Sequence, residues 1–234
     1  MEQTRYETDI NNQEVLISDQ EEQVMMEWEK PYMEACIDTL KPVGDVLEIG
    51  FGCAYSANKI QTYNPKSHTI IECDPEVLKR LHLWAVDKPN VIIVEGRWQD
   101  TLHTLGLFDE IFMDDFPLDL KKDENNFLDI HIKNSFRLYI FIDMCLRNHT
   151  RVGSKISAYL NNGGMLSNTK RIKECATIET TFIEVEISTD CRYRDSGKKT
   201  CSIPIVTKTQ PFNLYESLKN EYVREWTIRE LVKF

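Results

Sequence analysis

The sequence predicts an α/β protein built on a doubly wound, mostly parallel sheet of seven strands. From residue 45 onward, short apolar runs alternate with amphipathic stretches at the spacing typical of parallel strands joined by helices. The last two apolar runs follow one another without a helix between them, so we expect this pair to be antiparallel. The length of 234 residues fits one domain of this kind.

Each predicted element rests on a local pattern. The expected strands are the apolar runs at 46–49, 68–73, 90–94, 108–113, 154–160, 180–187 and 202–208. The expected helices cover 54–63, 75–85 and 125–146. An earlier helical pattern runs through Cys36, Ile37 and Leu40. Pro31 suits its first turn or a kink, because proline lacks the amide donor that a helix interior needs.

The predicted organisation has three parts. Residues 1–22 are polar except for an apolar group at 15–17, and we expect them to form a loosely held arm. Residues 23–208 form the main domain. Residues 209–234 bring aromatic and apolar side chains back at helical spacing, which predicts a helical extension that docks on the body or on a partner.

The charge balance excludes some classes of partner. Lys and Arg total 28 against 38 Asp and Glu, a net charge of -10. Neutralising phosphates or an anionic membrane surface requires a surplus of clustered cations, so we expect neither nucleic acid nor membrane as a partner. Oligomeric state is left open.

The cysteines indicate a reducing compartment. Their number, seven, is odd, and no C-x-x-C pair or signal-like apolar segment occurs. We therefore expect reduced thiols and a cytosolic protein. The five histidines are scattered without the spacing of a zinc site, so no metal is expected.

A glycine turn follows the first expected strand. The turn is Gly50-Phe51-Gly52, and such a turn lets the backbone approach a ligand at the carboxyl end of a sheet. The dinucleotide fingerprint needs a third glycine where this chain has Tyr55, which disfavours a pyrophosphate. Glu72 ends the second strand, where a carboxylate can accept hydrogen bonds from ribose hydroxyls. Together they favour a nucleoside cofactor without phosphates, of which S-adenosylmethionine is the commonest; the alternatives are a plain turn and a solvated carboxylate.

Two further strand ends carry candidate side chains. Trp98 and Gln99 follow the third strand and offer an aromatic wall and an amide for an adenine, although a tryptophan that serves only the core is the alternative. Asp114 and Asp115 end the fourth strand. Adjacent carboxylates there favour a bound cation or proton, and the alternative is an acidic pair exposed to water.

Several motifs occur together and in order. They are VMMEWEKPYM (24–33), VLEIGFG (46–52), IIEC (70–73), EGRWQD (95–100), FDEIFMDDFPL (108–118), IHIKNSFRL (130–138), DCRY (190–193) and PIVTK (204–208). Over residues 23–208 the chain resembles the guanidinoacetate N-methyltransferase family, and related arginine methyltransferases share part of the set. The resemblance implies a class I S-adenosylmethionine-dependent methyltransferase fold that acts on a guanidino nitrogen.

The resemblance also implies roles for individual residues. Asp114 and Glu29 would hold the guanidinium, Asp114 as proton acceptor. The expected cofactor-binding residues are Met33, Gly50, Phe51, Gly52, Cys53, Ala54, Tyr55, Ser56, Glu72, Cys73, Asp74, Trp98, Gln99 and Asp114. The expected substrate-binding residues are Met25, Glu29, Asp114, Asn162 and Gly163. Met25, Glu29 and Met33 are four apart and could share one helix face, although methionines at that spacing are more often core.

The chain also departs from the family pattern. Asp115 stands where the family has a small hydroxyl residue, and residues 161–163 replace a Leu-Thr-Ser segment that receives the substrate's carboxylate. An early tryptophan that covers the cofactor is missing, and Tyr6 could take its place. We therefore predict guanidino methylation, most simply of guanidinoacetate to creatine. The alternatives are methylation of arginine, free or in a peptide or protein, and a non-catalytic module that binds S-adenosylmethionine.

Overall fold

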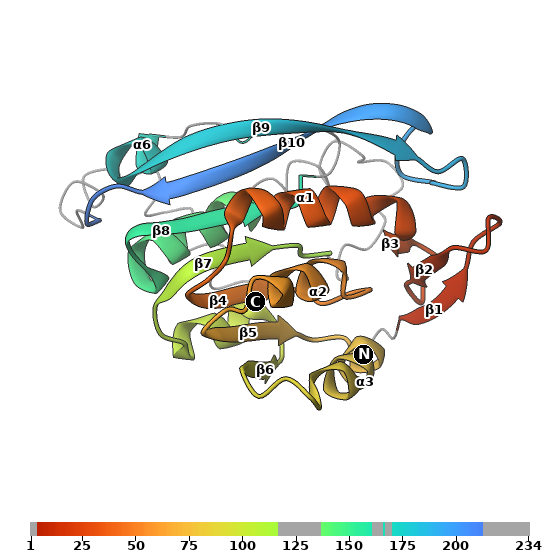
Figure 1. Ribbon diagram of the computed structural model, residues 1–234, viewed down its shortest axis with the longest axis horizontal. Helices are drawn as coiled ribbons and strands as arrows, with labels where there is room; N and C mark the ends of the chain where they lie inside the picture. The colour runs from red at the N-terminus through yellow and green to blue at the C-terminus, as the bar shows by residue number, and fades with distance from the viewer. Residues whose placement is uncertain (1–3, 117–136, 161–165, 167–169, 213–234) are drawn as a thin grey trace.

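A seven-stranded sheet forms the centre of the protein (Figure 1). The computed structural model describes residues 4–116, 137–160, 166 and 170–212. Its strand order is β6-β5-β4-β7-β8-β10-β9. The strands are β4 (Asp45–Ile49), β5 (Ser67–Glu72), β6 (Val91–Glu95), β7 (Phe108–Met113), β8 (Thr150–Ala158), β9 (Ala176–Ile187) and β10 (Gly197–Lys208). The first five are parallel, and β10 runs antiparallel to both β8 and β9, which confirms the predicted fold class.

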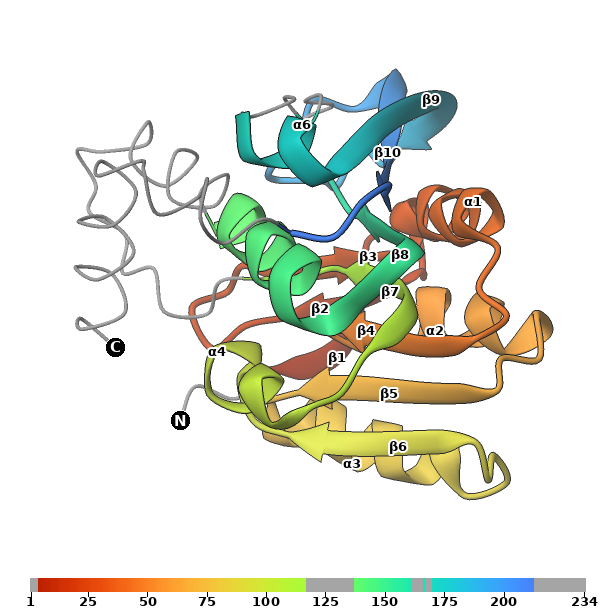
Figure 2. The ribbon, with the colours of Figure 1, turned by 90° about the vertical axis from the view of Figure 1, so that its left-hand side faces the viewer.

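Helices cover both faces of this sheet, as a doubly wound sheet requires. One face carries α1 (Lys30–Leu40), α2 (Tyr55–Thr62) and α3 (Pro75–Ala85). The other carries α4 (Trp98–Thr101), η2 (Leu102–Thr104), a helix over 137–144 that continues as η3 (Cys145–His149), and α6 (Lys170–Cys175). Figure 2 shows the green helix of 137–149 and α1 on opposite sides of β7 and β8.

The side chains of the strands alternate between two buried clusters. In β4, Val46 belongs to the cluster beneath α1 to α3, and Leu47 belongs to the cluster on the other face. Ile70 and Ile71 divide in the same way in β5. Because both faces of a parallel sheet are covered, these strands are continuous apolar runs, and this is why they could be predicted from sequence.

Three strands begin earlier than predicted. β8 begins at Thr150 instead of residue 154, and β9 and β10 begin at Ala176 and Gly197. The start of β8 contains an irregularity, since Phe108 pairs with Thr150 while Glu110 pairs with Lys155. The polar first half of each strand lacks the apolar pattern used for prediction.

The N-terminal segment is packed, which corrects the expectation of a loosely held arm. β1 (Arg5–Thr8), β2 (Glu14–Ile17) and β3 (Gln23–Met26) form a second, antiparallel sheet. Figure 1 shows it beyond the end of the main sheet toward which β5 and β7 point. The apolar side chains of residues 15–17 explain why this segment is packed, because all three are buried in the core beneath α1 and α2.

The expectation that Met25, Glu29 and Met33 share a helix face is wrong. Met25 lies in β3, Glu29 in the short helix η1 (Glu27–Glu29), and Met33 in α1. Glu29 accepts a hydrogen bond from the Met26 amide, which caps η1, and Pro31 occupies the first turn of α1 as expected. The α-helix therefore begins after Met25 and Glu29.

Two predictions concern residues outside the described part. Residues 125–136 of the third predicted helix lie there, as do residues 213–234 of the predicted C-terminal extension. In the described part of the chain, no helix is long and apolar enough to cross a membrane.

Candidate active site

A pocket lies at the carboxyl ends of β4, β5, β6 and β7. Its cavity volume of about 90 Å³ is several times the roughly 15 Å³ that one water molecule needs. It is lined by Thr4, Leu16, Val24, Met25, Ile49, Gly50, Gly52, Ile71, Glu72, Cys73, Asp74, Val77, Gly96, Arg97, Trp98, Gln99, Asp114, Asp115, Phe116 and Arg137. Nine of the predicted site residues are in this set: Met25, Gly50, Gly52, Glu72, Cys73, Asp74, Trp98, Gln99 and Asp114.

The glycine turn forms one wall of the pocket. Gly50 has φ +81°, and a Cβ placed there would lie 2.1 Å from the backbone oxygen of Asp114. Gly52 has φ +48°, and its Cβ would lie 2.7 Å from Cε of Met25. At Gly50 the close neighbour is backbone, so only glycine fits there at positive φ, and the turn brings bare backbone to the pocket.

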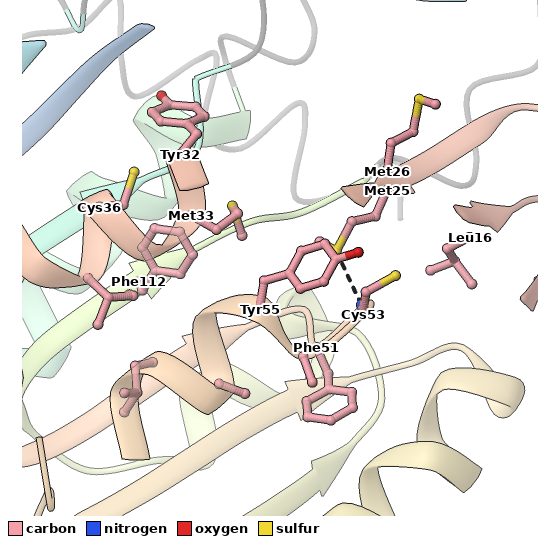
Figure 3. Packing of buried hydrophobic residues seen from close by; sticks show 14 of the residues in the cluster. Leu16, Met25, Met26, Tyr32, Met33, Cys36, Phe51, Cys53, Tyr55 and Phe112 are labelled. Atoms are coloured by element: carbon pink, nitrogen blue, oxygen red, sulfur yellow. Dashed lines mark hydrogen bonds between the residues drawn. The ribbon is translucent and has the colours of Figure 1, made fainter. Parts of the chain in front are cut away.

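Side chains between and after the glycines are directed into the protein core. Phe51, Cys53, Ala54, Tyr55 and Ser56 are all buried and lie outside the pocket lining. Figure 3 shows the Cys53 amide beside the Met25 sulfur, to which it donates a 3.1 Å hydrogen bond, and Phe51 pointing away from Met25. These residues hold the turn in place through backbone and core contacts.

Glu72 connects the glycine turn to the loop after β5. Its Oε2 accepts a hydrogen bond from the Phe51 amide (2.9 Å), and its Oε1 accepts from the Cys73 (2.6 Å) and Asp74 (2.8 Å) amides. Burial raises the pKa of Glu72, and these backbone donors act in the opposite direction. A carboxylate has about four acceptor positions, so about one remains for a ligand hydroxyl at the pocket.

Asp74 attaches the N-terminal segment to the pocket. It caps α3 by accepting hydrogen bonds from the Glu76 and Val77 amides. It also accepts from the Thr4 amide (3.0 Å) and the Thr4 hydroxyl (2.8 Å). Tyr6 donates its hydroxyl to the Gly52 backbone oxygen (2.8 Å), so it braces the turn from outside the lining. The N-terminal segment therefore contributes directly to the pocket wall.

Trp98 serves both the core and the pocket. It is buried, its ring packs edge-on against Phe141 at 5.2 Å, and it lines the pocket beside Gln99. Its Nε1 donates to Oδ2 of Asp115 (2.8 Å), which also receives Nη2 of Arg137 (2.6 Å). Asp115 is therefore paired with Arg137, whereas Asp114 forms no ion pair with any residue in the described part of the chain.

Asp114 lines the pocket directly after β7, where its amide donates to the Ile49 backbone oxygen (3.0 Å). Burial raises the pKa of Asp114 well above its usual range, and the charges of Glu29 and Asp115 raise it further. A carboxyl group in such surroundings gains its charged form when a cation binds beside it.

Glu29 is not part of the pocket lining and is 4% exposed. Its Oε1 accepts the Tyr159 hydroxyl (2.5 Å), and its Oε2 accepts the Met26 amide (2.9 Å). Burial raises the pKa of Glu29, while these two donors act in the opposite direction. Met33 is also buried, in the core beneath α1.

Sequence reasoning missed some residues of the site. Tyr159 directly follows β8, so the rule that ligands meet the carboxyl ends of strands could have found it. Thr4 and Arg137 carry no such signal, because each is far in sequence from the groups it contacts. Asn162 and Gly163 lie outside the described residues.

The fold and the site define a class of protein. The parallel sheet with its antiparallel last strands, and a pocket behind a glycine turn, are those of a class I S-adenosylmethionine-dependent methyltransferase. The fold is similar to that of N-methyltransferase NodS from Bradyrhizobium japonicum, with TM-score 0.52 and 13% identity over 78% of this chain and 97% of that one. It is also similar to spermidine synthase from Thermotoga maritima, with TM-score 0.51 and 14% identity over 90% of this chain and 74% of that one.

The family is narrower than this class. The family model described as guanidinoacetate N-methyltransferase matches residues 3–209, and the chain belongs to this family. Similar curated proteins are named protein arginine N-methyltransferase 2. The one from Candida glabrata is 47% identical over 105 residues, which cover 40% of this chain and 25% of that protein. The one from Saccharomyces cerevisiae is 36% identical over 116 residues, which cover 46% and 28%. The matched region thus spans about a quarter of these relatives.

Proposed function

We propose that this methyltransferase transfers a methyl group to a guanidino nitrogen, with arginine in a peptide or protein as the first acceptor class and guanidinoacetate as the second. The observation that carries the proposal is the Asp114 carboxyl group in the pocket, close to the charge of buried Glu29. The names of the similar curated proteins favour arginine, and the name of the family model favours guanidinoacetate. Both acceptors carry the same guanidino group.

The residues of the pocket fit S-adenosylmethionine. Gly50 leaves no room for a Cβ, Glu72 keeps an acceptor position for a ribose hydroxyl, and Trp98 offers an apolar wall. When bound, S-adenosylmethionine would supply a methyl group from its cationic sulfonium, and with the S–C bond broken it would leave as the neutral thioether. The carboxylates around the pocket balance that positive charge.

The acceptor must lose a proton. A guanidinium is protonated at neutral pH and its lone pairs are delocalised, so it is a poor nucleophile. Asp114 accepts hydrogen bonds from it and takes one N–H proton, which leaves an electron pair on that nitrogen for the new N–C bond. The raised pKa of Asp114 makes it a stronger base than an exposed aspartate. Glu29, held by Tyr159 and Met26, keeps a second negative charge behind the guanidinium.

Mass spectrometry of the products tests the proposal. The protein is incubated with S-adenosylmethionine and, separately, guanidinoacetate, free arginine and an arginine-containing peptide. We expect one of the guanidino compounds to gain a methyl group. Asp114→Asn should abolish transfer while S-adenosylmethionine still binds, and Asp38→Asn on the surface of α1 is the matched control. No transfer to any acceptor, or full activity of D114N, would overturn the proposal; the first result with intact cofactor binding would favour a non-catalytic binding module.

The proposed setting is the cytosol. All seven cysteines carry free thiols, the state that a reducing compartment maintains. The net charge of -10 favours a cationic acceptor such as an arginine-containing peptide over nucleic acid or an anionic membrane.

A further inference from the structure

Asp115 is the centre of a polar contact between three parts of the pocket wall. Its Oδ2 accepts Nε1 of Trp98 at 2.8 Å and Nη2 of Arg137 at 2.6 Å. Trp98 begins α4, Asp115 follows β7, and Arg137 belongs to the helix over 137–144. All three residues line the pocket.

The ion pair between Arg137 and Asp115 is stronger than a pair on the protein surface. The side chains of Arg137 and Asp115 are only 20% and 16% exposed, so water screens their attraction weakly. Without Arg137, Asp115 would place an unpaired negative charge next to Asp114. Two unpaired carboxylates side by side would compete for the same cationic group.

Asp115 in turn fixes the Trp98 ring. The indole N–H points at Asp115, and the ring packs edge-on against Phe141 at an interplanar angle of 79°. These two contacts constrain both the position and the plane of the ring. A ring held in this way presents a defined apolar surface to the pocket.

We propose that Arg137 is a positioning residue of the methyl-transfer site: by holding Asp115 it orients Trp98 in the cofactor pocket and leaves Asp114 as the carboxylate that receives the guanidino group. The part that concerns Asp114 rests on the proposed function. The part that concerns Trp98 requires only that S-adenosylmethionine binds in this pocket.

A double-mutant cycle tests the link through Trp98. Arg137→Met removes the ion pair, and Trp98→Phe keeps an aromatic ring but removes the N–H that Asp115 receives. Calorimetry then measures the Kd of S-adenosylmethionine for the wild type, both single variants and the double variant. A hydrogen bond to a charged group is worth enough to change an affinity about tenfold. We expect R137M to raise Kd about tenfold in the wild-type background and less than about twofold in the W98F background.

The control is a second ion pair, which involves a residue of β7 itself. Arg151 pairs with Asp109 at the other end of β7 (3.0 Å), and both side chains are more exposed. Arg151→Met should leave Kd unchanged. An unchanged Kd for R137M, or an equal effect of R137M in both backgrounds, would overturn the proposal. If R137M does not fold, Asp115→Ala replaces it in the same double-mutant cycle, and the same changes in Kd support or overturn the proposal.

Steady-state kinetics separate this proposal from the proposed function. R137M should also raise KM for the guanidino acceptor, because the freed Asp115 carboxylate offers it a second, unproductive position beside Asp114. A raised Kd together with an unchanged acceptor KM would overturn the Asp114 part. A wild-type protein that binds S-adenosylmethionine but methylates no guanidino compound would overturn the proposed function. The double-mutant cycle, which measures only cofactor binding, would still test the link through Trp98.

Discussion

Replacing Gly50 by alanine tests whether the glycine turn forms the cofactor pocket by close backbone packing. Gly50 has φ +81°, and an added Cβ would lie 2.1 Å from the Asp114 backbone oxygen, an impossible contact without movement of the chain. Positive φ costs an alanine about 1–2 kcal/mol, and forcing an atom into a packed site costs about 1–3 kcal/mol more. Gly50→Ala should therefore lower the free energy of unfolding by roughly 2–5 kcal/mol.

Gly153 supplies the matched control. It has φ +96°, but a Cβ there would meet nothing within 4 Å. Gly153→Ala should therefore lose only the cost of positive φ, about 1–2 kcal/mol. Urea denaturation gives the two free energies of unfolding, and calorimetry gives the Kd of S-adenosylmethionine. We expect weaker cofactor binding for G50A and an unchanged Kd for G153A. Equal losses of stability, or an unchanged Kd for G50A, would refute the packing argument.

Two further predictions concern the carboxyl groups. The pKa of Asp114 is raised in the folded protein, so between an unfolded pKa near 3.8 and its native value the folded state binds more protons. The contribution of Asp114 to stability should therefore decrease as pH rises from 5 to 7. Urea denaturation of the wild type and D114N at both pH values should show a smaller decrease in the free energy of unfolding for D114N. An equal decrease in the two proteins would contradict the assignment. Tyr159→Phe removes the donor to Oε1 of Glu29 and should lower kcat about tenfold with little change in the Kd of S-adenosylmethionine. Tyr63→Phe removes a comparable bond to exposed Asp38 and is its control; equal kcat values for the two variants would refute a role for Tyr159 in positioning Glu29.

Part of the site could be predicted because it follows from where strands end. Gly50, Glu72, Trp98 and Asp114 each follow or end a different strand of the parallel sheet, and parallel strands bring such residues to one edge. The pattern that marks the strands therefore also locates these four residues, and no knowledge of long-range contacts is needed.

Other roles depended on contacts that no local pattern encodes. The sequence indicates that Asp115 adds a charge beside the site, but it does not show that Arg137, 22 residues away in sequence, pairs with that charge. The sequence suggests that residues 15–17 are a minor apolar group in a polar arm, but in the structure they are buried in the core. The spacing of the sequence suggests that Glu29 belongs to a helix face shared with Met25 and Met33. In the structure, hydrogen bonds from the Met26 amide and the Tyr159 hydroxyl hold Glu29 in a separate short helix.

The sequence by itself determined the seven strands of the main sheet in chain order, the glycine turn and the residues at the strand ends, because apolar period and glycine geometry act over a few residues. Only the tertiary structure decided which carboxyl groups are paired, which are buried, and which segment forms the remaining wall of the pocket. Charge pairing and desolvation depend on distances between groups remote in sequence, such as Thr4 and Asp74 or Tyr159 and Glu29. The chemistry of Asp114 is therefore set by neighbours that the fold supplies.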